Sequence, residues 1–200
     1  MRSRARTGPN RNGRASRPRS PSIPPETRTL LDVGCGRGDL LHAIDVPFSV
    51  GTDLARRGIR FVRRPAMVSS MLSLPFPDRS FDVVLCAETL EHLDPADLVR
   101  ATAELRRIAR KSLVVTVPYQ EDLLAWSTRC SRCGTVFHLY GHRNVFSPER
   151  LKALFPGAAH YAVQGIWPVR ADVSRAAALS HRDTRPLEIL AVRPLPRVRQ

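Results

Sequence analysis

A glycine-rich segment directly after a short apolar run restricts the fold more than any other feature of this chain. Residues 30–41 read LLDVGCGRGDLL, and Thr29–Val33 has the composition of a buried strand. The segment carries three glycines at alternate positions, Gly34, Gly36 and Gly38. Glycine tolerates a positive φ and has no Cβ atom, so the backbone can turn sharply here and approach a ligand closely. The sequence therefore predicts a strand, a tight turn and a ligand above the turn.

Strand and helix patterns alternate along most of the chain. The expected strands are Thr29–Val33, Phe48–Asp53, Phe81–Cys86, Ser112–Val117 and Leu187–Val192, with weaker candidates at Ala66–Ser70 and Tyr161–Ile166. The expected helices cover Asp39–Asp45, the segment from Asp94 to about Arg110, and a segment between Ser147 and Pro156. Such alternation is typical of an open, mostly parallel α/β sheet. Because prolines flank Leu187–Val192, this strand suits a sheet edge or a strand end better than the middle of the sheet.

The glycine spacing argues against a nucleotide bound through its phosphates. A dinucleotide-binding turn needs G-x-G-x-x-G, whereas the next position here is Asp39, whose charge would repel a diphosphate at a helix N-terminus. The turn also lacks the Lys-Ser/Thr pair of a phosphate-binding loop. A cationic ligand without phosphates fits this turn better than NAD, FAD or ATP.

Four segments in this order resemble the class I S-adenosylmethionine-dependent methyltransferases, in the branch that includes many small-molecule methyltransferases. They are DVGCGRG at residues 32–38, Asp53 at the end of the second strand, LPFPDRSFDVVLC at residues 74–86, and AETLEHL at residues 87–93. The resemblance runs from about Leu30 to Pro118. It implies a Rossmann-like, doubly wound, seven-stranded and mostly parallel sheet, with S-adenosylmethionine as the cofactor.

The resemblance also implies roles for individual residues. Asp32 and the glycine turn would receive the methionine part and the sugar, and Asp53 would bind both ribose hydroxyls. The position that usually carries an adenine-reading aspartate is Ser70, whose hydroxyl is a weaker acceptor than a carboxylate. Met71 and Glu88 would complete the cofactor site. Each assignment has a structural alternative. The glycines would only shape a tight turn, Asp53 would be a loop cap, and Ser70 would be an ordinary loop hydroxyl.

A proton must leave the acceptor if the methyl group goes to a hydroxyl or a protonated amine. His92 follows the fourth strand on the expected acceptor side, with Glu88 and Glu91 nearby, and is the candidate base. A structural hydrogen-bonding role for His92 is the alternative. The AETL sequence does not resemble the N/D-P-P-Y/F motif of amino-methylating DNA enzymes, so that substrate class is disfavoured.

Residues 120–146 interrupt the alternation and form a predicted insertion after the fifth strand. This segment contains the pattern C-x2-C-x4-H-x3-H, made by Cys130, Cys133, His138 and His142. Four ligands of these types predict one structural zinc, since no coordination position would remain open. A redox C-x-x-C pair and unligated side chains are the alternatives. The insertion would cover the acceptor site, as a lid in a small-molecule enzyme or as a knuckle in a nucleic-acid enzyme.

The N-terminal segment differs in composition from the rest of the chain. The formal net charge is +14, and residues 1–27 are rich in arginine, proline and serine. Such a segment cannot bury enough apolar surface to offset its ordering entropy, so we expect a disordered tail followed by one domain over residues 28–200. No apolar run approaches the roughly 20 residues that cross a bilayer, and no apolar signal region is present. We expect a soluble, cytoplasmic protein without a membrane partner.

Three functions are compatible with these patterns. The first is a methyltransferase that acts on a small-molecule or carrier-linked acceptor. The second is an RNA-directed methyltransferase, which the basic tail and the knuckle-like insertion favour. The third is a catalytically silent binding protein with the same fold, for which Ser70 is the hint. The acceptor atom and the oligomeric state have no signal in the sequence.

Overall fold

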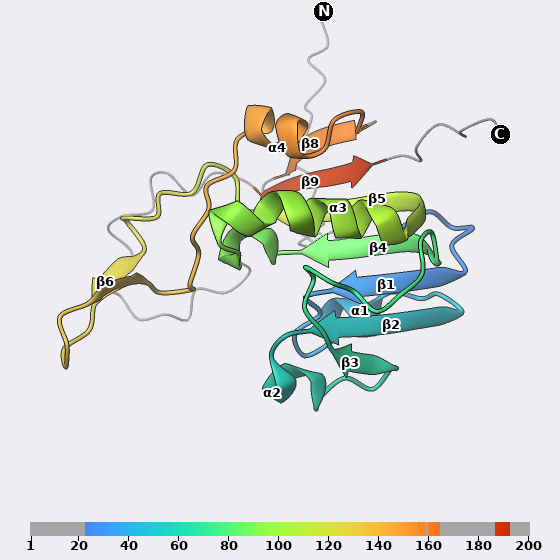
Figure 1. Ribbon diagram of the computed structural model, residues 1–200, viewed down its shortest axis with the longest axis horizontal. Coiled ribbons are helices and arrows are strands. Elements are labelled where there is room, and N and C mark those ends of the chain that lie inside the picture. The colour runs from blue at the N-terminus through green and yellow to red at the C-terminus, as the bar shows by residue number, and fades with distance from the viewer. Residues whose placement is uncertain (1–22, 159, 165–186, 193–200) are drawn as a thin grey trace, which may run out of the picture.

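The main sheet of the protein is mostly parallel. The computed structural model describes residues 23–158, 160–164 and 187–192. The strands of the main sheet are β1 Thr29–Val33, β2 Phe48–Asp53, β3 Ala66–Val68, β4 Phe81–Ala87, β5 Ala109–Val117, β8 His160–Gln164 and β9 Leu187–Val192. Their spatial order is β3-β2-β1-β4-β5-β9-β8 (Figure 1). The first five strands pair in parallel, and β9 runs antiparallel to both β5 and β8.

Strand burial explains why β1, β4 and β5 occupy the middle of the sheet. Residues 81–86 of β4 and 113–117 of β5 are buried without interruption, as are residues 30–33 of β1. Strands that are covered on both faces have continuous apolar runs, because helices pack on each side of a parallel sheet. The predicted bounds of β1, β2 and β9 agree with the structure. However, β9 lies between β5 and β8, so the edge placement is wrong, whereas the strand-end alternative agrees with its bounds, Leu187–Val192, which leave both flanking prolines outside the strand.

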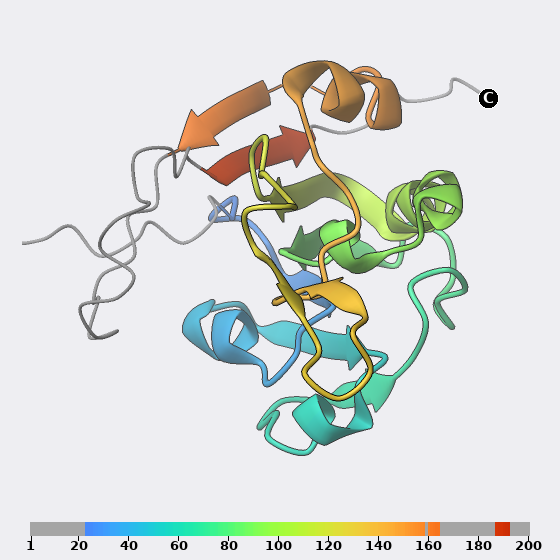
Figure 2. The same ribbon diagram turned by 90° about the vertical axis from the view of Figure 1, so that its left-hand side faces the viewer.

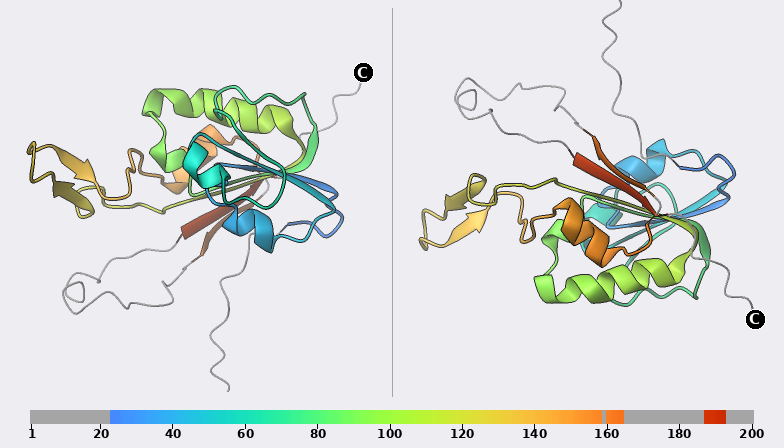
Figure 3. Two further views of the ribbon diagram at one scale, coloured as in Figure 1. Left: turned by 90° about the horizontal axis from the view of Figure 1, so that it is seen from below. Right: turned by 90° about the horizontal axis from the view of Figure 1, so that it is seen from above.

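Helices cover both faces of the sheet (Figure 3). They are α1 Asp39–Ala43, α2 Arg56–Ile59, α3 Leu98–Ile108 and α4 Pro148–Leu154. The apolar stripe of α3, together with Leu151 of α4, packs on one face of β1, β4 and β5. On the opposite face, Leu41 of α1 belongs to a smaller core with Leu30, Val83 and Val114. The two cores confirm the expected arrangement of helices on both sides of a mostly parallel sheet.

The starts of α3 and α4 can be compared with the helix starts predicted from the sequence. At Asp94 and Pro95, where a helix was expected, a short 3₁₀ turn (η2, Pro95–Asp97) precedes α3, and the Asp94 side chain makes no capping hydrogen bond. The predicted start at Ser147 is confirmed, because the Ser147 hydroxyl accepts a hydrogen bond from the Arg150 backbone N–H at 3.3 Å. The Ser-Pro pair at the start of α4 therefore acts as a helix cap.

The chain segment before β1 packs on the domain from Ile23 onward. Ile23 contacts the smaller core, and Thr27 is buried. Next to it, the Arg28 and Thr29 backbone N–H groups donate to the buried carboxylate of Asp82. Residues 23–27, which the composition assigned to the tail, are thus part of the domain surface. Residues 1–22 of the predicted tail lie outside the described residues.

The segment between β5 and α4 projects beyond the ends of the central strands (Figures 1 and 3), and a view from that side shows it in front of them (Figure 2). It carries an antiparallel hairpin, β6 Ser127–Arg129 and β7 Val136–His138. A β-bridge between Tyr119 and Phe146 closes its base. The hairpin lies on the side where the parallel strands end, which is the side where open α/β sheets bind ligands. Among the described residues, no helix is long and apolar enough to cross a bilayer.

Candidate functional site

A cavity of about 810 Å³ opens at the ends of β1, β2 and β4. Its size falls within the range of small-molecule sites. Among the residues predicted from the sequence, the cavity is lined by Gly34, Gly36, Asp53, Ser70, Met71, Glu88 and His92. The structure therefore brings most of the predicted cofactor residues and the predicted base together around one space. Gly38 and Asp32 lie outside this lining, at the start of α1 and within β1.

The glycine turn has the backbone that its sequence predicts. Gly34, Gly36 and Gly38 have φ values of 79°, 54° and 82°, which side-chain-bearing residues rarely adopt. The Gly34 and Cys35 backbone N–H groups donate to the carbonyl of Thr52 in β2. The turn is thereby fixed to the neighbouring strand, and its open face is left toward the cavity.

Asp53 joins this turn to the loop after β2. One carboxylate oxygen accepts a hydrogen bond from Gly36 N at 2.8 Å, and the other accepts one from Ala55 N at 2.7 Å. Each oxygen has a second lone pair, so the carboxylate can still accept hydrogen bonds from a ligand in the cavity. Asp53 is thus a loop cap in this structure, in a position where it can also bind a diol.

The carboxylates of Asp32 and Asp53 interact electrostatically at the cavity, which Asp53 lines and Asp32 does not. Asp32 is 2% exposed. Burial, reinforced by the negative charge of Asp53, raises the pKa of Asp32 to about 7. Burial, reinforced by the same two carboxylates, raises the pKa of the neighbouring Cys35 thiol to about 12. Because the site disfavours further negative charge, it suits a ligand that brings positive charge.

Ser70 and Met71 also line the cavity. The Ser70 hydroxyl accepts a hydrogen bond from Leu72 N at 3.2 Å, so its own hydrogen remains available as a donor. Met71 is buried, with its side chain in the larger core. The structure places both residues at the cavity, as predicted, and gives Ser70 a turn-stabilising role as well.

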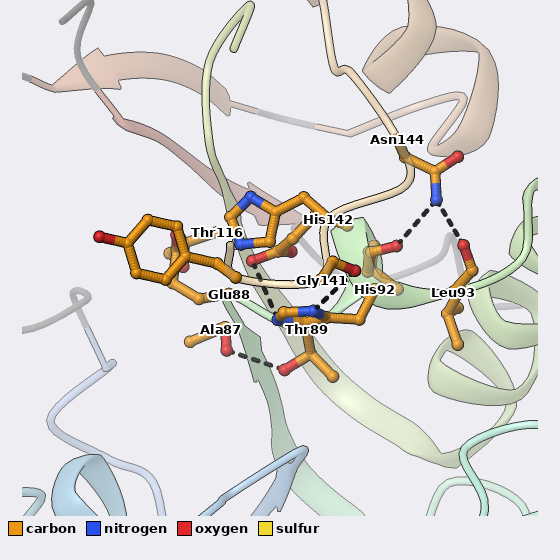
Figure 4. A network of polar contacts seen from close by, with 12 residues as sticks. Ala87, Glu88, Thr89, His92, Leu93, Thr116, Gly141, His142 and Asn144 are labelled. Atoms are coloured by element: carbon orange, nitrogen blue, oxygen red, sulfur yellow. Dashed lines mark hydrogen bonds and ion pairs between the residues drawn. The ribbon is translucent and has the colours of Figure 1, made fainter. Parts of the chain in front are cut away.

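Glu88 follows β4 in a strained conformation. Its φ is 49°, which is uncommon for a residue with a side chain and occurs often at functional sites. The Thr116 hydroxyl donates to Glu88 Oε1 at 2.8 Å (Figure 4). Burial raises the pKa of Glu88. The carboxylate is therefore held at the cavity wall by a residue of β5.

His92 and Glu91 belong to a 3₁₀ turn, η1 Leu90–His92, that follows β4. His92 lines the cavity, and burial together with the charge of His142 lowers its pKa, which keeps the ring neutral at pH 7. The Glu91 side chain is only 1% exposed, and neither of its carboxylate oxygens has a hydrogen-bond partner. Burial and the negative charge of Glu88 raise the pKa of Glu91 to about 8.

The insertion holds its four predicted zinc ligands in two separate places. His138 and His142 lie with Glu121 at the base, where one ligand atom from each residue lies within 4.8 Å of the others. Cys130 and Cys133 lie in the turn between β6 and β7, where the Cys133 thiol donates to the Thr135 hydroxyl at 3.3 Å. Within the part of the chain that the structure describes, no group of three or more possible metal ligands includes either cysteine. The structure does not assemble the predicted Cys/His tetrad.

Glu121 and Thr116 were not expected at the site from the sequence, and Glu91 was expected on the acceptor side but without a role of its own. Glu121 follows the end of β5 by only four residues, which places it at the ligand-binding edge of the sheet. The sequence position of Glu121 was therefore sufficient to predict that it lies near the site. By contrast, the contact between Thr116 and Glu88 depends on the pairing of β4 with β5, which no local pattern specifies.

Comparison with protein families matches residues 31–115 to the family described as "Methyltransferase domain". Among curated proteins, the ubiquinone biosynthesis O-methyltransferase of Neisseria meningitidis serogroup A is 33% identical over 93 residues, which cover 39% of this chain and 39% of that protein. The corresponding protein of Bordetella parapertussis is 34% identical over 96 residues, with coverages of 42% and 40%. The chain thus spans about two fifths of the length of these curated relatives.

Solved structures resemble this chain over most of its length. A SAM-dependent methyltransferase from Methanosarcina mazei superposes with a TM-score of 0.63 at 18% identity, over 85% of this chain and 93% of that one. A chain in the complex between the Haloferax volcanii Trm112 methyltransferase activator and the putative methyltransferase gives 0.62 at 19% identity, over 85% and 83%. At such identities the likeness establishes the fold, which agrees with the Rossmann-like, mostly parallel α/β fold that the resemblance implied.

Proposed function

We propose that this chain, whose residues 31–115 form a class I S-adenosylmethionine-dependent methyltransferase domain, transfers a methyl group to a small-molecule or carrier-linked acceptor. One observation supports this proposal more than any other. The glycine turn, Asp53 and Ser70 line the same cavity as His92, so a cofactor region and an acceptor region are continuous.

The residues present fit the cofactor. The carboxylate of Asp53, which lines the cavity, and the nearby carboxylate of Asp32 create an environment that favours a cationic ligand. Asp53 keeps acceptor capacity for the two ribose hydroxyls, and Ser70 keeps a donor hydrogen for a ring nitrogen of adenine. Gly34 and Gly36 expose backbone on which the ligand can lie without meeting a Cβ atom.

S-adenosylmethionine supplies an activated methyl group, and its transfer needs no covalent enzyme nucleophile. The protein contributes by orienting the acceptor in line with the methyl–sulfur bond and by excluding water. The acceptor region lies where Glu88, His92 and Arg143 line the cavity. His92, neutral at pH 7, is the predicted group for receiving a proton there.

A small acceptor is favoured over the alternatives. Two curated relatives carry the name ubiquinone biosynthesis O-methyltransferase, which describes a small acceptor in those proteins. The basic segment that suggested RNA lies largely within residues 1–22, outside the described residues, and therefore adds no structural support. The proposed methyl transfer does not need zinc. The predicted zinc ligands, two cysteines and two histidines, are not brought together in the structure.

Calorimetric titration with S-adenosylmethionine tests the cofactor part of the proposal. We expect one site per chain, and competition by S-adenosylhomocysteine. Transfer of a radiolabelled methyl group to a panel of small phenols, catechols and carboxylic acids then tests the acceptor class, with total RNA as the comparison. Cofactor binding with label only in RNA would favour the RNA-directed alternative, and absence of cofactor binding would favour the silent one.

A further inference from the structure

Six ionisable side chains converge where the insertion meets the turn after β4. They are three carboxylates and three imidazoles, from Glu88, Glu91, Glu121, His92, His138 and His142. Two sets of three could hold a metal ion, Glu91–His92–His142 and Glu121–His138–His142, and they share one histidine. Because a neutral imidazole binds a cation only through its unprotonated nitrogen, the hydrogen bonds of each ring decide between the two sets.

His142 has its proton on the nitrogen that faces Glu121. His142 Nδ1 lies 2.5 Å from Glu121 Oε2, and an ionised carboxylate accepts hydrogen bonds but cannot donate them. Nδ1–H therefore donates to Glu121, and Nε2 keeps its lone pair. A carboxylate bonded to the second nitrogen is the usual support for a histidine that ligates a metal through its first, since it fixes both the tautomer and the ring orientation.

His92 has the same arrangement. Its Nδ1 lies 3.4 Å from the carbonyl oxygen of Gly141, which can only accept, so Nδ1 donates and Nε2 keeps its lone pair. The rings of His92 and His142 are neighbours, with centroids 4.9 Å apart and nearly perpendicular planes (Figure 4). Two imidazoles from different segments thus each keep a nitrogen lone pair that their hydrogen bonds do not use.

His138 differs from both. Its Nδ1 accepts hydrogen bonds from the backbone N–H groups of Tyr140 and His142, so the proton of the neutral ring is on Nε2. This nitrogen faces Glu121 Oε1 at 3.6 Å and has no hydrogen-bond partner. His138 is therefore oriented as a donor toward Glu121 and not as a metal ligand. The set that contains His138 is chemically the weaker one.

Glu91 provides independent evidence that a cation belongs here. Its side chain is 99% buried, yet neither carboxylate oxygen has a hydrogen-bond partner, and Oε1 lies 4.0 Å from His92 Nε2. A buried carboxylate without a partner is costly, and a coordinated cation is one of the few ways to satisfy it. The Glu91 carbonyl oxygen accepts from Arg143 N and Asn144 N, which fixes the insertion beside this carboxylate.

We propose that Glu91, His92 and His142 bind one divalent transition-metal cation at the acceptor end of the cavity. Glu121 positions His142, and His138 in turn faces Glu121. Two imidazoles and one carboxylate suit zinc, iron, cobalt or manganese in the divalent state. Three protein ligands leave coordination positions open, and His92 lines the cavity, so an open position faces the acceptor region.

The bound cation has a specific chemical role at this site. That role rests on the proposed methyl transfer, whereas metal binding does not depend on it. An acceptor hydroxyl that coordinates the cation loses its proton to water more readily, because the cation stabilises the resulting oxyanion. The oxyanion oxygen then forms the bond to the methyl carbon as the methyl–sulfur bond breaks. In the metal-bound protein, the lone pair of His92 Nε2 is used in coordination, and the cation replaces His92 as the group that activates the acceptor.

The test uses the full chain, freed of metal by a chelator and titrated with Zn²⁺ by calorimetry and with Co²⁺ by absorption spectroscopy. We expect one tight site per chain. Glu91→Gln and His142→Ala should each weaken binding by at least about 100-fold, because each removes a ligand. Glu121→Gln should weaken it by about 10–100-fold, which is typical for the loss of a group that orients a ligand.

Cys133→Ser is the matched control. It removes a ligand that the sequence predicted for zinc but that lies outside the site proposed here. Binding should be unchanged in this variant, and the Co²⁺ spectrum should lack thiolate-to-metal charge transfer. Thermal melting without metal and titration with S-adenosylmethionine show whether each variant is folded. The proposal is overturned if the chain binds no metal, if folded Glu91→Gln or His142→Ala binds as the wild type does, or if Cys133→Ser loses the site. Failure of methyl transfer with metal binding intact would contradict only the proposed function.

Discussion

Gly34 and Thr89 approach each other so closely that no side chain fits between the glycine turn and the turn after β4. A Cβ atom on Gly34 would overlap the hydroxyl and the methyl group of Thr89 and would lie 2.9 Å from its Cβ atom. Thr89 cannot easily move away, because its hydroxyl donates to the Ala87 carbonyl at 2.8 Å. This contact joins the cofactor side of the cavity to the segment that carries Glu88, Glu91 and His92.

Gly34→Ala should therefore be more harmful than the same change at Gly36. At Gly34 the new Cβ atom meets both a positive φ and an occupied space, so we expect a loss of about 3 kcal/mol or more in the free energy of unfolding. At Gly36 a Cβ atom would meet nothing within 4 Å, and the unfavourable φ alone predicts about 1–2 kcal/mol. Urea unfolding of both variants measures the difference. Equal losses would mean that Thr89 moves away at little cost.

Asp53→Ala should weaken binding of S-adenosylmethionine by about 2–3 kcal/mol, or about 30–150-fold, since two ribose hydroxyls lose a charged acceptor. The change also removes the acceptor for Gly36 N and Ala55 N, so melting temperatures must accompany the titrations. Asp53→Asn, which keeps one acceptor oxygen, should lie between alanine and wild type. Asp45→Asn removes an exposed charge outside the cavity and serves as the control. An unchanged affinity in Asp53→Ala would exclude this residue from the site.

The sequence alone was sufficient to predict the part of the site that depends on local backbone conformation. A glycine turn between a buried strand and a helix leaves few alternatives, because the positive φ values at Gly34, Gly36 and Gly38 require glycine and the next strand follows within a short distance. Asp53, at the end of that strand, shares the cavity for the same reason. Parallel strands that end at one sheet edge bring their terminal residues together.

The metal-ligand pattern failed because ligand spacing does not determine which direction a loop folds. Cys130, Cys133, His138 and His142 are close in sequence, but the β6–β7 hairpin separates its turn from its base. The histidines instead meet Glu121 and Glu91, which lie outside the motif and come from chain segments on either side of β5. Side chains that gather from several segments leave no contiguous pattern for sequence analysis to recognise.

Binding of S-adenosylmethionine should depend on pH through Asp32. Burial and Asp53 raise the pKa of Asp32 to about 7, so much of this carboxyl is protonated below that pH in the free protein. A cationic ligand favours the ionised form, and binding should therefore release a proton and weaken as pH falls below about 7. Calorimetry in buffers of different ionisation enthalpy counts the released protons. In Asp32→Asn this release should disappear, and a wild-type affinity that is constant from pH 5 to 8 would contradict the role.

Acid should unfold the protein partly through Glu104, which connects α3 to the loop before β4. Glu104 accepts two hydrogen bonds from the Arg107 guanidinium, at 2.8 and 2.9 Å, and one from Leu74 N at 3.0 Å. The Arg107 hydrogen bonds lower the pKa of Glu104 to about 2. Because the pKa in the folded state lies below that of the unfolded chain, the stabilisation is complete above about pH 4.5 and is lost as pH falls toward 2.

Glu104→Gln removes the titrating group and keeps the shape of the side chain, so its effect on stability should change with pH. At pH 7 we expect the variant to be less stable than the wild type by about 1–3 kcal/mol, the range for hydrogen bonds that involve a charged group. Near pH 2 the two proteins should differ much less, since the wild-type carboxyl is then about half protonated in the folded state and almost fully protonated in the unfolded chain. Asp82 contributes in the same direction, because the Lys111 and Arg110 hydrogen bonds outweigh its burial and hold its pKa well below the usual range. The comparison must therefore be between the urea-unfolding free energies of variant and wild type at each pH. If the difference at pH 7 persists unchanged near pH 2, then packing of the Glu104 side chain and not its charge stabilises the contact between α3 and the Leu74 loop.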